Sequence, residues 1–448
     1  MSFLQGRLVA LVCLAATGTA RAPAAEQPGA ELLSGPYAIA PGADGATVCW
    51  QTEAKSPGAV RVRAEGAADW TEFRESGTTR FHAVRLAGLA AGADHQVEVL
   101  AGPGGKKLGG LALRTAPARA GEFTFFVLGD TQGRPEENAR VPRAMLAEAQ
   151  RLGQFALVLH VGDLAGDGYD EPGLVRGFFR PAAGLLARVP VVPVRGNHDI
   201  DGQLLKRCFP APARAGFFEA DDYCLDYGPL RLVVLDGNAP GKTRDRRMNW
   251  LRDRLAEAAD RWRMVAVHQP IYSRGDHGSQ DEDVRTLRGL LEPYLVAGRV
   301  HAVFSGHDHD YQRSRPVQGV TYFVSGGGGA LVERQPRIGP QDWSARYEPT
   351  LNFLAVTVGP EKLTVRALRP AGKDDAEFTA FDAVEIPRDG LWPAVDLAAT
   401  PEVEHNYEDL RPNPLRRALL VGGSALLAVA LAIKLARRAR RRPAGKAG

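Results

Sequence analysis

Two patterns of apolar and polar positions divide the chain. From about residue 32 to 115, short segments such as "ATVCWQT" and "HQVEVLAG" alternate apolar and polar residues between turns rich in glycine, proline and alanine. This alternation predicts an antiparallel β-sandwich. Beyond residue 122, continuous apolar runs such as "FTFFVLGD" and "FALVLHVGD" alternate with segments of helical periodicity such as "NWLRDRLAEA". Such runs are typical of strands buried on both faces of an α/β fold. The sequence therefore predicts an all-β domain at residues 31–116 and an α/β domain at residues 122–386.

Both ends of the chain carry an apolar run beside basic residues. Residues 8–16 follow Arg7 and precede small residues, which predicts a signal peptide over residues 1–24, with a short buried helix as the alternative. Residues 418–433 lie between arginine clusters and predict a transmembrane anchor over residues 416–438. An amphipathic surface helix and a cleaved sorting tail are its alternatives. A Pro-rich linker at 387–415 and a basic cytoplasmic tail at 439–448 would flank the anchor. We expect an extracytoplasmic protein, periplasmic or at the cell surface, held to the membrane by its C-terminal helix.

The net charge of +4 is produced by the C-terminal tail. Residues 416–448 hold nine Lys and Arg and no Asp or Glu, so the rest of the chain has a net charge of −5. No basic face for nucleic acid is implied, and we expect no nucleic-acid partner. Cys208 and Cys224 lie sixteen residues apart and could form a disulfide in an exported chain, which would leave Cys49 as a small core residue.

Metal-ligating residue types recur where the predicted strands of the α/β domain end. In chain order they are Asp130, Asp163, the Asn197–His198 pair, His268, and His307 with His309. Strand ends of this kind gather on one edge of a sheet, where ligands bind. Carboxylates, imidazoles and an amide oxygen suit two divalent or trivalent cations, which can clamp the phosphoryl oxygens of an in-line displacement. Each residue alone is more often a turn residue, a helix cap or a core histidine. The ordered series of five motifs predicts a dinuclear site.

The series "GD … GD … GNHD … H … GHDH" resembles the calcineurin-like metallophosphoesterases. The resemblance is closest to the purple acid phosphatase-like branch, to which "NWLRDRL" and "RMVAVHQPIYS" are also similar. In that branch a fibronectin type III-like sandwich precedes the catalytic domain. The resemblance implies a four-layer α/β/β/α metallophosphoesterase sandwich preceded by an all-β fibronectin III-like domain, and the apolar run at residues 418–433 adds a C-terminal transmembrane helix.

The resemblance also implies seven metal ligands: Asp130, Gln132, Asp163, Asn197, His268, His307 and His309. Asp163 would bridge two ions. Asp130 and His309 would complete the first ion's shell, with Gln132 as a weak ligand. The remaining three would hold the second ion.

Three further residues are assigned to the substrate side of the site. His198 would bind substrate and act on the leaving group, as a general acid or by stabilising charge. Asp199 would orient His198. His277, in the loop after the His268 strand, could contact substrate phosphate, although a solvated loop histidine is the alternative. Asp308, between two of the ligands, is expected to point away from them.

Two positions depart from the family pattern. Purple acid phosphatases have a tyrosine three residues after the bridging aspartate, and its bond to Fe(III) gives their colour. This chain has Gly166 there, and Tyr169 lies six residues on. Many metallophosphoesterases have histidine where this chain has Gln132. We therefore expect a colourless site of two metal ions, with Fe, Mn and Zn combinations left open.

Together these features predict an exported, membrane-tethered hydrolase. We expect it to hydrolyse small phosphomonoesters, as acid phosphatases do, by attack of a metal-bound hydroxide. A phosphodiesterase or nucleotide hydrolase using the same site is one alternative. A non-catalytic cell-surface binding protein on a phosphoesterase scaffold is another.

Overall fold

The computed structural model describes residues 31–390 and 392, apart from 120, 134, 154, 200–202, 211–220, 239–243, 279–280, 331, 333–334 and 373–376. The predicted signal peptide, transmembrane anchor and basic tail lie outside the described residues, as does most of the predicted linker. Within the part that is described, no helix is both long enough and apolar enough to cross a membrane.

The N-terminal part is a two-sheet β-sandwich. Its strands are β1 (Leu32–Gly42), β2 (Gly45–Ser56), β3 (Ala59–Ala64), β4 (Thr71–Arg74), β5 (Thr79–Arg85), β6 (Asp94–Leu100) and β7 (Lys107–Arg114). A sheet in the order β4-β3-β6-β7 faces β1, β2 and β5. Trp50 lies in the core between the two, with Val60 and Val97 opposite. The alternation in the sequence therefore predicted the architecture, whereas the fibronectin type III assignment is not confirmed and stays a prediction.

The larger part contains two mixed sheets and their helices. Its strands are β8 (Phe123–Leu128), β9 (Val158–His160), β10 (Val191–Pro193), β11 (Tyr223–Tyr227), β12 (Leu230–Leu235), β13 (Trp262–Val267), β14 (Ala302–Ser305), β15 (Tyr311–Ser314), β16 (Thr321–Ser325), β17 (Ser344–Glu348), β18 (Phe353–Val358), β19 (Lys362–Pro370) and β20 (Phe378–Pro387). Its helices are α1 (Pro135–Leu152), α2 (Glu171–Leu174), the π-helix η1 (Val175–Phe179), α3 (Arg180–Leu186), α4 (Leu204–Cys208), α5 (Arg244–Ala256) and α6 (Glu282–Ala297).

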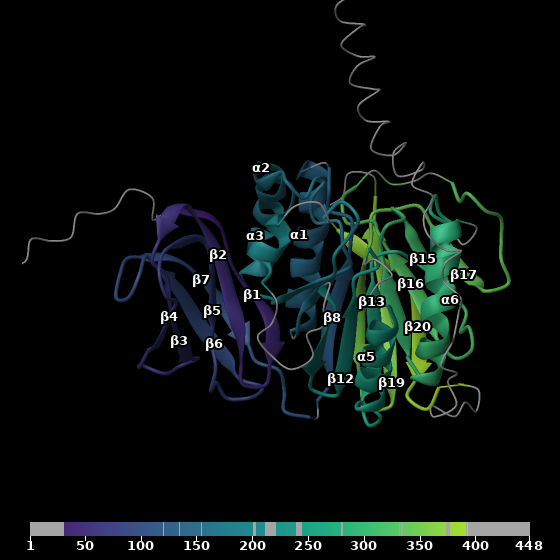
Figure 1. Ribbon diagram of the computed structural model, residues 1–448, viewed down its shortest axis with the longest axis horizontal. Helices are drawn as coiled ribbons and strands as arrows, with labels where there is room; N and C mark the ends of the chain where they lie inside the picture. The colour runs from purple at the N-terminus through teal and green to yellow at the C-terminus, as the bar shows by residue number, and fades with distance from the viewer. Residues whose placement is uncertain are drawn as a thin grey trace, which may run out of the picture. The chain divides into compact units, whose positions relative to one another are not determined.

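The two sheets pack face to face with helices outside them (Figure 1). One has the order β20-β19-β18-β8-β9-β10-β1-β2-β5, and the other β11-β12-β13-β14-β16-β15-β17. Successive side chains of a strand point to opposite faces. Phe125 thus lies in the core between the sheets, and Phe126 packs with Met145 of α1. Val265 of β13 packs in the same way with Leu251 of α5. The predicted α/β fold is confirmed.

The nine-stranded sheet joins the two parts of the chain. Strand β1 pairs in parallel with β10 through Ile39 and Val191. The outer face of β1 and β2 is also buried, because Tyr37 and Cys49 pack in one cluster with Phe179. The sequence carried no signal of this join, since a strand with two buried faces has the same pattern whichever element covers its second face.

All three described cysteines are free. Cys208 packs with Tyr37 in the cluster beside β1, whereas Cys224 packs against the α5 and α6 side of the seven-stranded sheet. The disulfide between Cys208 and Cys224 that their spacing suggested is therefore absent.

Candidate metal centre

The structure brings the predicted ligands together at one edge of the two sheets. Asp130, Asp163 and His307 follow the ends of β8, β9 and β14, and all three have positive φ angles, of 61°, 54° and 73°. L-residues seldom adopt this conformation, which costs on the order of 1–3 kcal/mol where it occurs and is concentrated at functional sites. Glycine allows the close approach of neighbouring segments. A Cβ on Gly162 would lie 2.3 Å from His268 Nδ1, and one on Gly196 would lie 2.0 Å from Asp163 Oδ1.

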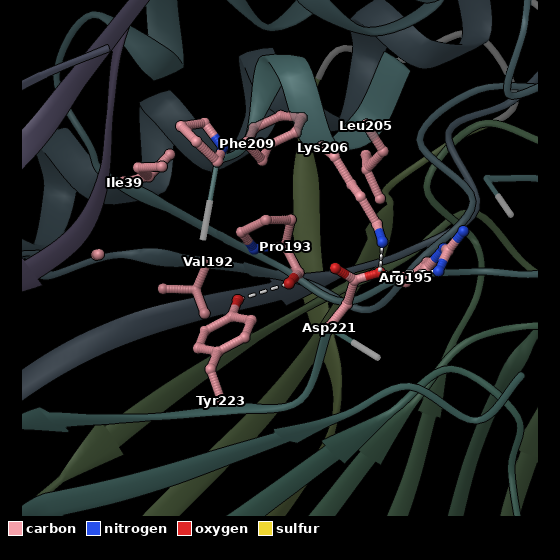
Figure 2. Close-up of a pocket in the computed structure, with 11 residues that line it drawn as sticks. Ile39, Val192, Pro193, Arg195, Leu205, Lys206, Phe209, Asp221 and Tyr223 are labelled. Atoms are coloured by element: carbon pink, nitrogen blue, oxygen red, sulfur yellow. Dashed lines mark hydrogen bonds and ion pairs between the residues drawn. The ribbon is translucent and has the colours of Figure 1, made fainter. Parts of the chain in front are cut away.

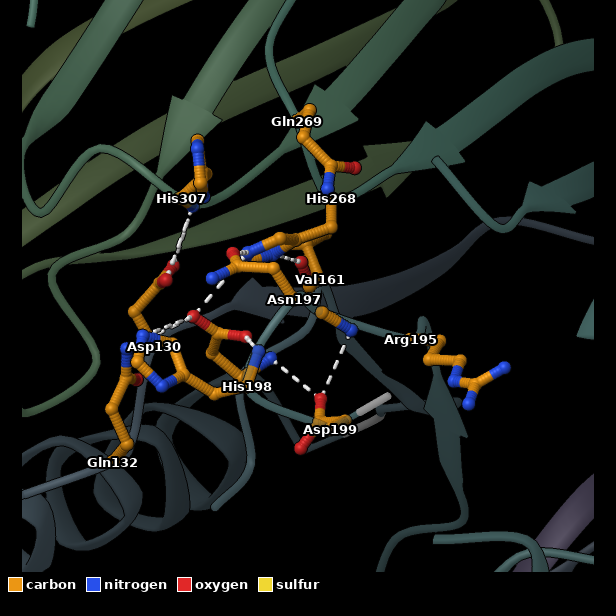
Figure 3. A network of polar contacts seen from close by, with 12 residues as sticks. Asp130, Gln132, Val161, Arg195, Asn197, His198, Asp199, His268, Gln269 and His307 are labelled. Atoms are coloured by element: carbon orange, nitrogen blue, oxygen red, sulfur yellow. Dashed lines mark hydrogen bonds and ion pairs between the residues drawn. The ribbon is translucent and has the colours of Figure 1, made fainter. Parts of the chain in front are cut away.

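The second predicted metal position is the more compact one (Figure 3). Ligand atoms of Asp163, His268 and His307 all lie within 4.8 Å of one another. His268 Nε2 is 3.0 Å from Asn197 Oδ1 and 3.4 Å from Asp163 Oδ2. His268 Nδ1 donates to the Val161 carbonyl at 2.7 Å. That bond orients the ring so that Nε2 faces the other ligands, as second-partner bonds do in metal-binding histidines.

The first predicted position is formed by Asp130, Gln132 and His309 around the same Asp163. His309 Nε2 lies 3.7 Å from Asp130 Oδ1. The Gln132 amide nitrogen donates to Asp163 Oδ2 at 3.0 Å and lies 3.3 Å from His309 Nε2. Gln132 Oε1 is buried without a hydrogen-bond partner. An amide flip would turn this oxygen toward the other ligands, so the residues present fit a second ion bound by oxygen and imidazole donors.

The buried charges of the site attract cations. Burial, reinforced by Asp163, raises the pKa of Asp130 well above its ordinary value despite the opposing effect of His268. Burial acts to raise the pKa of Asp163 too, but the positive charges of His268 and His198 outweigh it and the pKa falls below its usual range. Burial would lower the pKa of His268, yet Asp163 and Asp130 raise it to about 10. Burial and the charge of His268 lower the pKa of His307 to about 2. A cation bound here would be attracted by the ionised Asp163 and would offset the burial that disfavours the charged form of Asp130.

His198 lies at the open side of the site. Its side chain is 47% exposed, and its Nε2 is 3.9 Å from Asp163 Oδ2. Its Nδ1 lies 3.1 Å from the Gly166 carbonyl, and its backbone N–H donates to Asp163 Oδ1 at 2.9 Å. With Nδ1 donating to Gly166, Nε2 is the nitrogen left to face a substrate.

Among the described residues, the Asp199 carboxylate makes no hydrogen bond to the imidazole of His198, and the prediction that Asp199 orients His198 stays a prediction. Its buried carboxylate instead accepts backbone N–H groups from Asp163 at 2.9 Å and Gly196 at 3.0 Å. It also accepts N–H groups from Ala165 at 3.3 Å and Leu164 at 3.4 Å. Burial and the charge of Asp163 raise the pKa of Asp199 to about 6, against the effect of these donors. Asp199 therefore ties the loop after β9 to the loop after β10.

His277 lies beside the predicted ligands. Its ring centroid is 4.0 Å from that of His307. Its backbone N–H donates to Asp308 Oδ1 at 2.8 Å, and Asp308 Oδ2 accepts the Ser273 hydroxyl. Asp308 thus points away from the ligands, as predicted, and fixes the loop that carries His277.

Two asparagines that are not among the predicted site residues support this edge. Asn238 donates to the Gly196 carbonyl at 3.2 Å and accepts Gln269 Nε2 at 2.7 Å, which links the loops after β10, β12 and β13. Asn138 donates to the carbonyl of Thr131, next to Gln132. The strand-end rule could have found Asn238, because "VVLDGN" also ends a buried strand. Asn138 lies within α1 and had no such signal.

A cavity of about 280 Å³ is lined in part by residues of β10 and by Arg195, which follows it (Figure 2). Most of the residues that line it are apolar. The carboxylate of Asp221 also lines it and forms ion pairs with Arg195 at 2.8 Å and with Lys206 at 3.5 Å. Tyr223 donates to the Pro193 carbonyl at 2.6 Å. These contacts hold the segment that leads into Asn197.

Comparisons with known proteins agree with the family that the metal-ligand motifs indicate. Residues 123–311 match the family model described as calcineurin-like phosphoesterase. Tartrate-resistant acid phosphatase type 5 of Homo sapiens is 29% identical over 218 residues, which are 42% of this chain and 66% of the human protein. The chain thus spans slightly less than two thirds of that relative. The Fe(3+)-Zn(2+) purple acid phosphatase 12 of Arabidopsis thaliana is 26% identical over 223 residues, 46% of each chain.

The fold has a solved counterpart as well. The purple acid phosphatase from yellow lupin (Lupinus luteus) seeds superposes with a TM-score of 0.65 at 17% identity, covering 79% of this chain and 74% of the lupin chain. The predicted resemblance is confirmed: residues 123–311 match the calcineurin-like phosphoesterase model, and the chain has homologues among the purple acid phosphatases.

Proposed function

We propose that this protein is a metal-dependent phosphatase that holds two metal ions and hydrolyses small phosphomonoesters. The observation that carries the proposal is the convergence of the seven predicted ligands on one edge of the sheets, with Asp163 at the centre of both groups. The activities named for the acid phosphatase relatives support the same conclusion.

The ligand assignment follows the two groups of contacts. Asp130, Gln132 and His309 would hold one ion, and Asn197, His268 and His307 would hold the other, with Asp163 shared. Once bound, two such ions supply positive charge to the phosphoryl oxygens and lower the pKa of a water that serves as nucleophile. The oxygen and imidazole donors are compatible with Fe, Mn or Zn, and the relative named for Fe and Zn supports a mixed pair.

The chain's own residues would position the phosphate and stabilise the leaving group. His198 is anchored at Nδ1 by Gly166, so a protonated Nε2 can donate to the leaving oxygen or stabilise its charge. His277, whose ring centroid lies 4.0 Å from that of His307, would contact a phosphoryl oxygen. Asp199 and Asn238 hold the backbone of the loops that carry these groups.

Export and membrane tethering are proposed from the sequence pattern alone. The apolar runs at residues 8–16 and 418–433, with their basic neighbours, support them. An extracytoplasmic phosphatase would act on phosphorylated small molecules outside the cytoplasm.

The test compares Asp163→Asn and His307→Ala with the wild type on p-nitrophenyl phosphate. Both variants should lose at least about 1,000-fold in kcat, since they remove ligands of the reacting centre, while retaining a cooperative thermal transition. Asp94→Asn, on an exposed ion pair of the sandwich, is the matched control and should leave activity unchanged. Full activity in either ligand variant would refute the mechanism.

The same assay separates the alternative functions. Faster hydrolysis of bis(p-nitrophenyl) phosphate than of the monoester would favour a phosphodiesterase. Metal binding with no hydrolysis of any phosphate ester would favour a non-catalytic binding protein.

A further inference from the structure

We infer that the N-terminal sandwich positions His198, through an ion pair between Arg80 of β5 and Glu171 at the start of α2. The inference rests on the proposed function for His198. It assigns Arg80 and Gln51 as positioning residues that never touch the substrate.

The sandwich and the loop of the metal centre share one apolar core. The outer face of the sandwich contributes Tyr37 and Ile39, and the residues directly after Asp163 contribute Leu164 and Ala165 to the same cluster. The Tyr37 ring lies 5.0 Å from that of Phe179 in the helical segment that begins at α2. The loop after β9 is therefore packed against strands of the sandwich as well as against its own domain.

A polar contact lies at the rim of this core, where α2 begins. Arg80 Nη2 is 2.6 Å and Gln51 Nε2 is 2.7 Å from Glu171 Oε1, while Arg80 Nη1 is 3.5 Å from Oε2. The guanidinium is itself held by a bond from Nε to the Thr52 carbonyl at 3.2 Å. Exposed single ion pairs contribute little to stability. This one is about one-third exposed at Arg80 and has a third partner, so its effect should be on the position of α2.

A short loop with its own internal hydrogen bonds connects Glu171 to Gly166, whose carbonyl accepts from His198. The Glu171 N–H donates to the Tyr169 carbonyl at 3.1 Å, and the Asp170 N–H donates to the Asp167 carbonyl at 3.0 Å. Asp167 also accepts the Tyr169 N–H at 2.8 Å through its side chain. Gly166, which directly precedes Asp167, provides the carbonyl that holds His198 Nδ1. In this proposal, movement of Glu171 is transmitted to the Gly166 carbonyl, which holds the imidazole at Nδ1.

The expected consequence is specific to the leaving group. A misplaced His198 slows the departure of an alkoxide, which needs a proton or charge stabilisation, far more than that of a nitrophenolate, which leaves without help. The metal ligands themselves stay in place, because the backbone of Asp163 is held independently by the carboxylate of Asp199.

The experiment measures kcat and KM of the metal-loaded, full-length protein for an alkyl phosphate and for p-nitrophenyl phosphate. Arg80→Ala should lower kcat for the alkyl ester about threefold to tenfold, with less than a twofold change for the aryl ester. Glu171→Gln should have the same effect, and the double variant should be no worse than either, since both break one contact. Arg61→Ala is the matched control: it breaks an Arg–Glu pair elsewhere in the sandwich, to Glu98 at 2.7 Å, and should change neither rate.

A readout that does not depend on turnover accompanies the kinetics. Amide hydrogen exchange over residues 163–171 should be faster in Arg80→Ala and Glu171→Gln than in the wild type and Arg61→Ala. Equal losses on both esters, or exchange that matches the control, would overturn the inference. If the wild type hydrolyses neither ester, the proposed function fails, and the exchange data still decide whether the sandwich fixes this loop.

Discussion

Replacement of Asp199 by asparagine tests how the metal centre is held together. The buried carboxylate accepts four backbone N–H groups from two loops, three of them through Oδ2 and one, from Ala165, through Oδ1. An asparagine oxygen can replace Oδ2, but its NH2 group then faces the Ala165 N–H. In the variant, the three bonds to Oδ2 become bonds to a neutral oxygen, and in place of the fourth bond the side-chain NH2 group and the Ala165 N–H, both donors, face each other. Since a hydrogen bond to a charged group is worth about 1.5–3 kcal/mol, we expect Asp199→Asn to lower the free energy of unfolding by about 2–4 kcal/mol.

The loops that Asp199 joins carry Asp163 and Asn197, so the variant should also weaken metal binding. Loss of an outer partner of this kind typically costs about 10–100-fold in affinity. Urea unfolding and competition with a chromogenic chelator measure the two effects. Asp382→Asn is the control: Asp382 pairs with Arg313 at 2.7 Å, so this variant should lose stability and keep its metal affinity. A fall in kcat with unchanged stability and metal affinity would refute the reasoning, because that is the result expected if Asp199 acted on the imidazole of His198.

Three other predictions follow from particular residues. The metal-loaded protein should show no strong visible tyrosinate band, since Tyr169 is 72% exposed, and a purple wild-type preparation would contradict this. Gly166→Tyr should gain such a band with iron, because a Cβ at this position meets only the Gln132 Cβ, at 3.8 Å. Gln132→His should retain more metal after dialysis against a weak chelator, and equal retention would mean that the residue does not reach an ion. Burial lowers the pKa of His301 to about 4, and the Arg263 N–H donates to its Nδ1 at 3.1 Å, so protonation there is unfavourable. Neutral His301 therefore stabilises the fold above about pH 6.5, and about 3 kcal/mol of the free energy of unfolding is lost as the pH falls toward 4. Urea unfolding at pH 7 and 4.5 should show a smaller loss in His301→Gln than in the wild type.

The sequence predicted well what depends on local pattern. Continuous apolar runs identified the buried strands, and the polar residues that end them identified the edge where the ligands meet, because backbone topology brings such ends together. Asp130, Asp163 and His307 could be assigned in this way without any long-range information.

The features that the sequence did not predict depend on contacts between distant segments. The bonds of Asp199 could not be predicted, because the fold brings backbone donors from the loop after β9 to its carboxylate. The parallel pairing of β1 with β10 likewise requires knowledge of which surface covers the second face of β1. Arg80 and Glu171 lie 91 positions apart and look like ordinary surface charges until the fold joins them.

The central claim is that Asp163 lies between two bound ions that the phosphatase reaction requires. The most direct test is metal analysis of the purified protein joined to hydrolysis of p-nitrophenyl phosphate before and after chelation. We expect about two ions per chain, loss of activity on their removal, and recovery when metal is returned. Undiminished hydrolysis in a protein shown to be free of metal would contradict the claim.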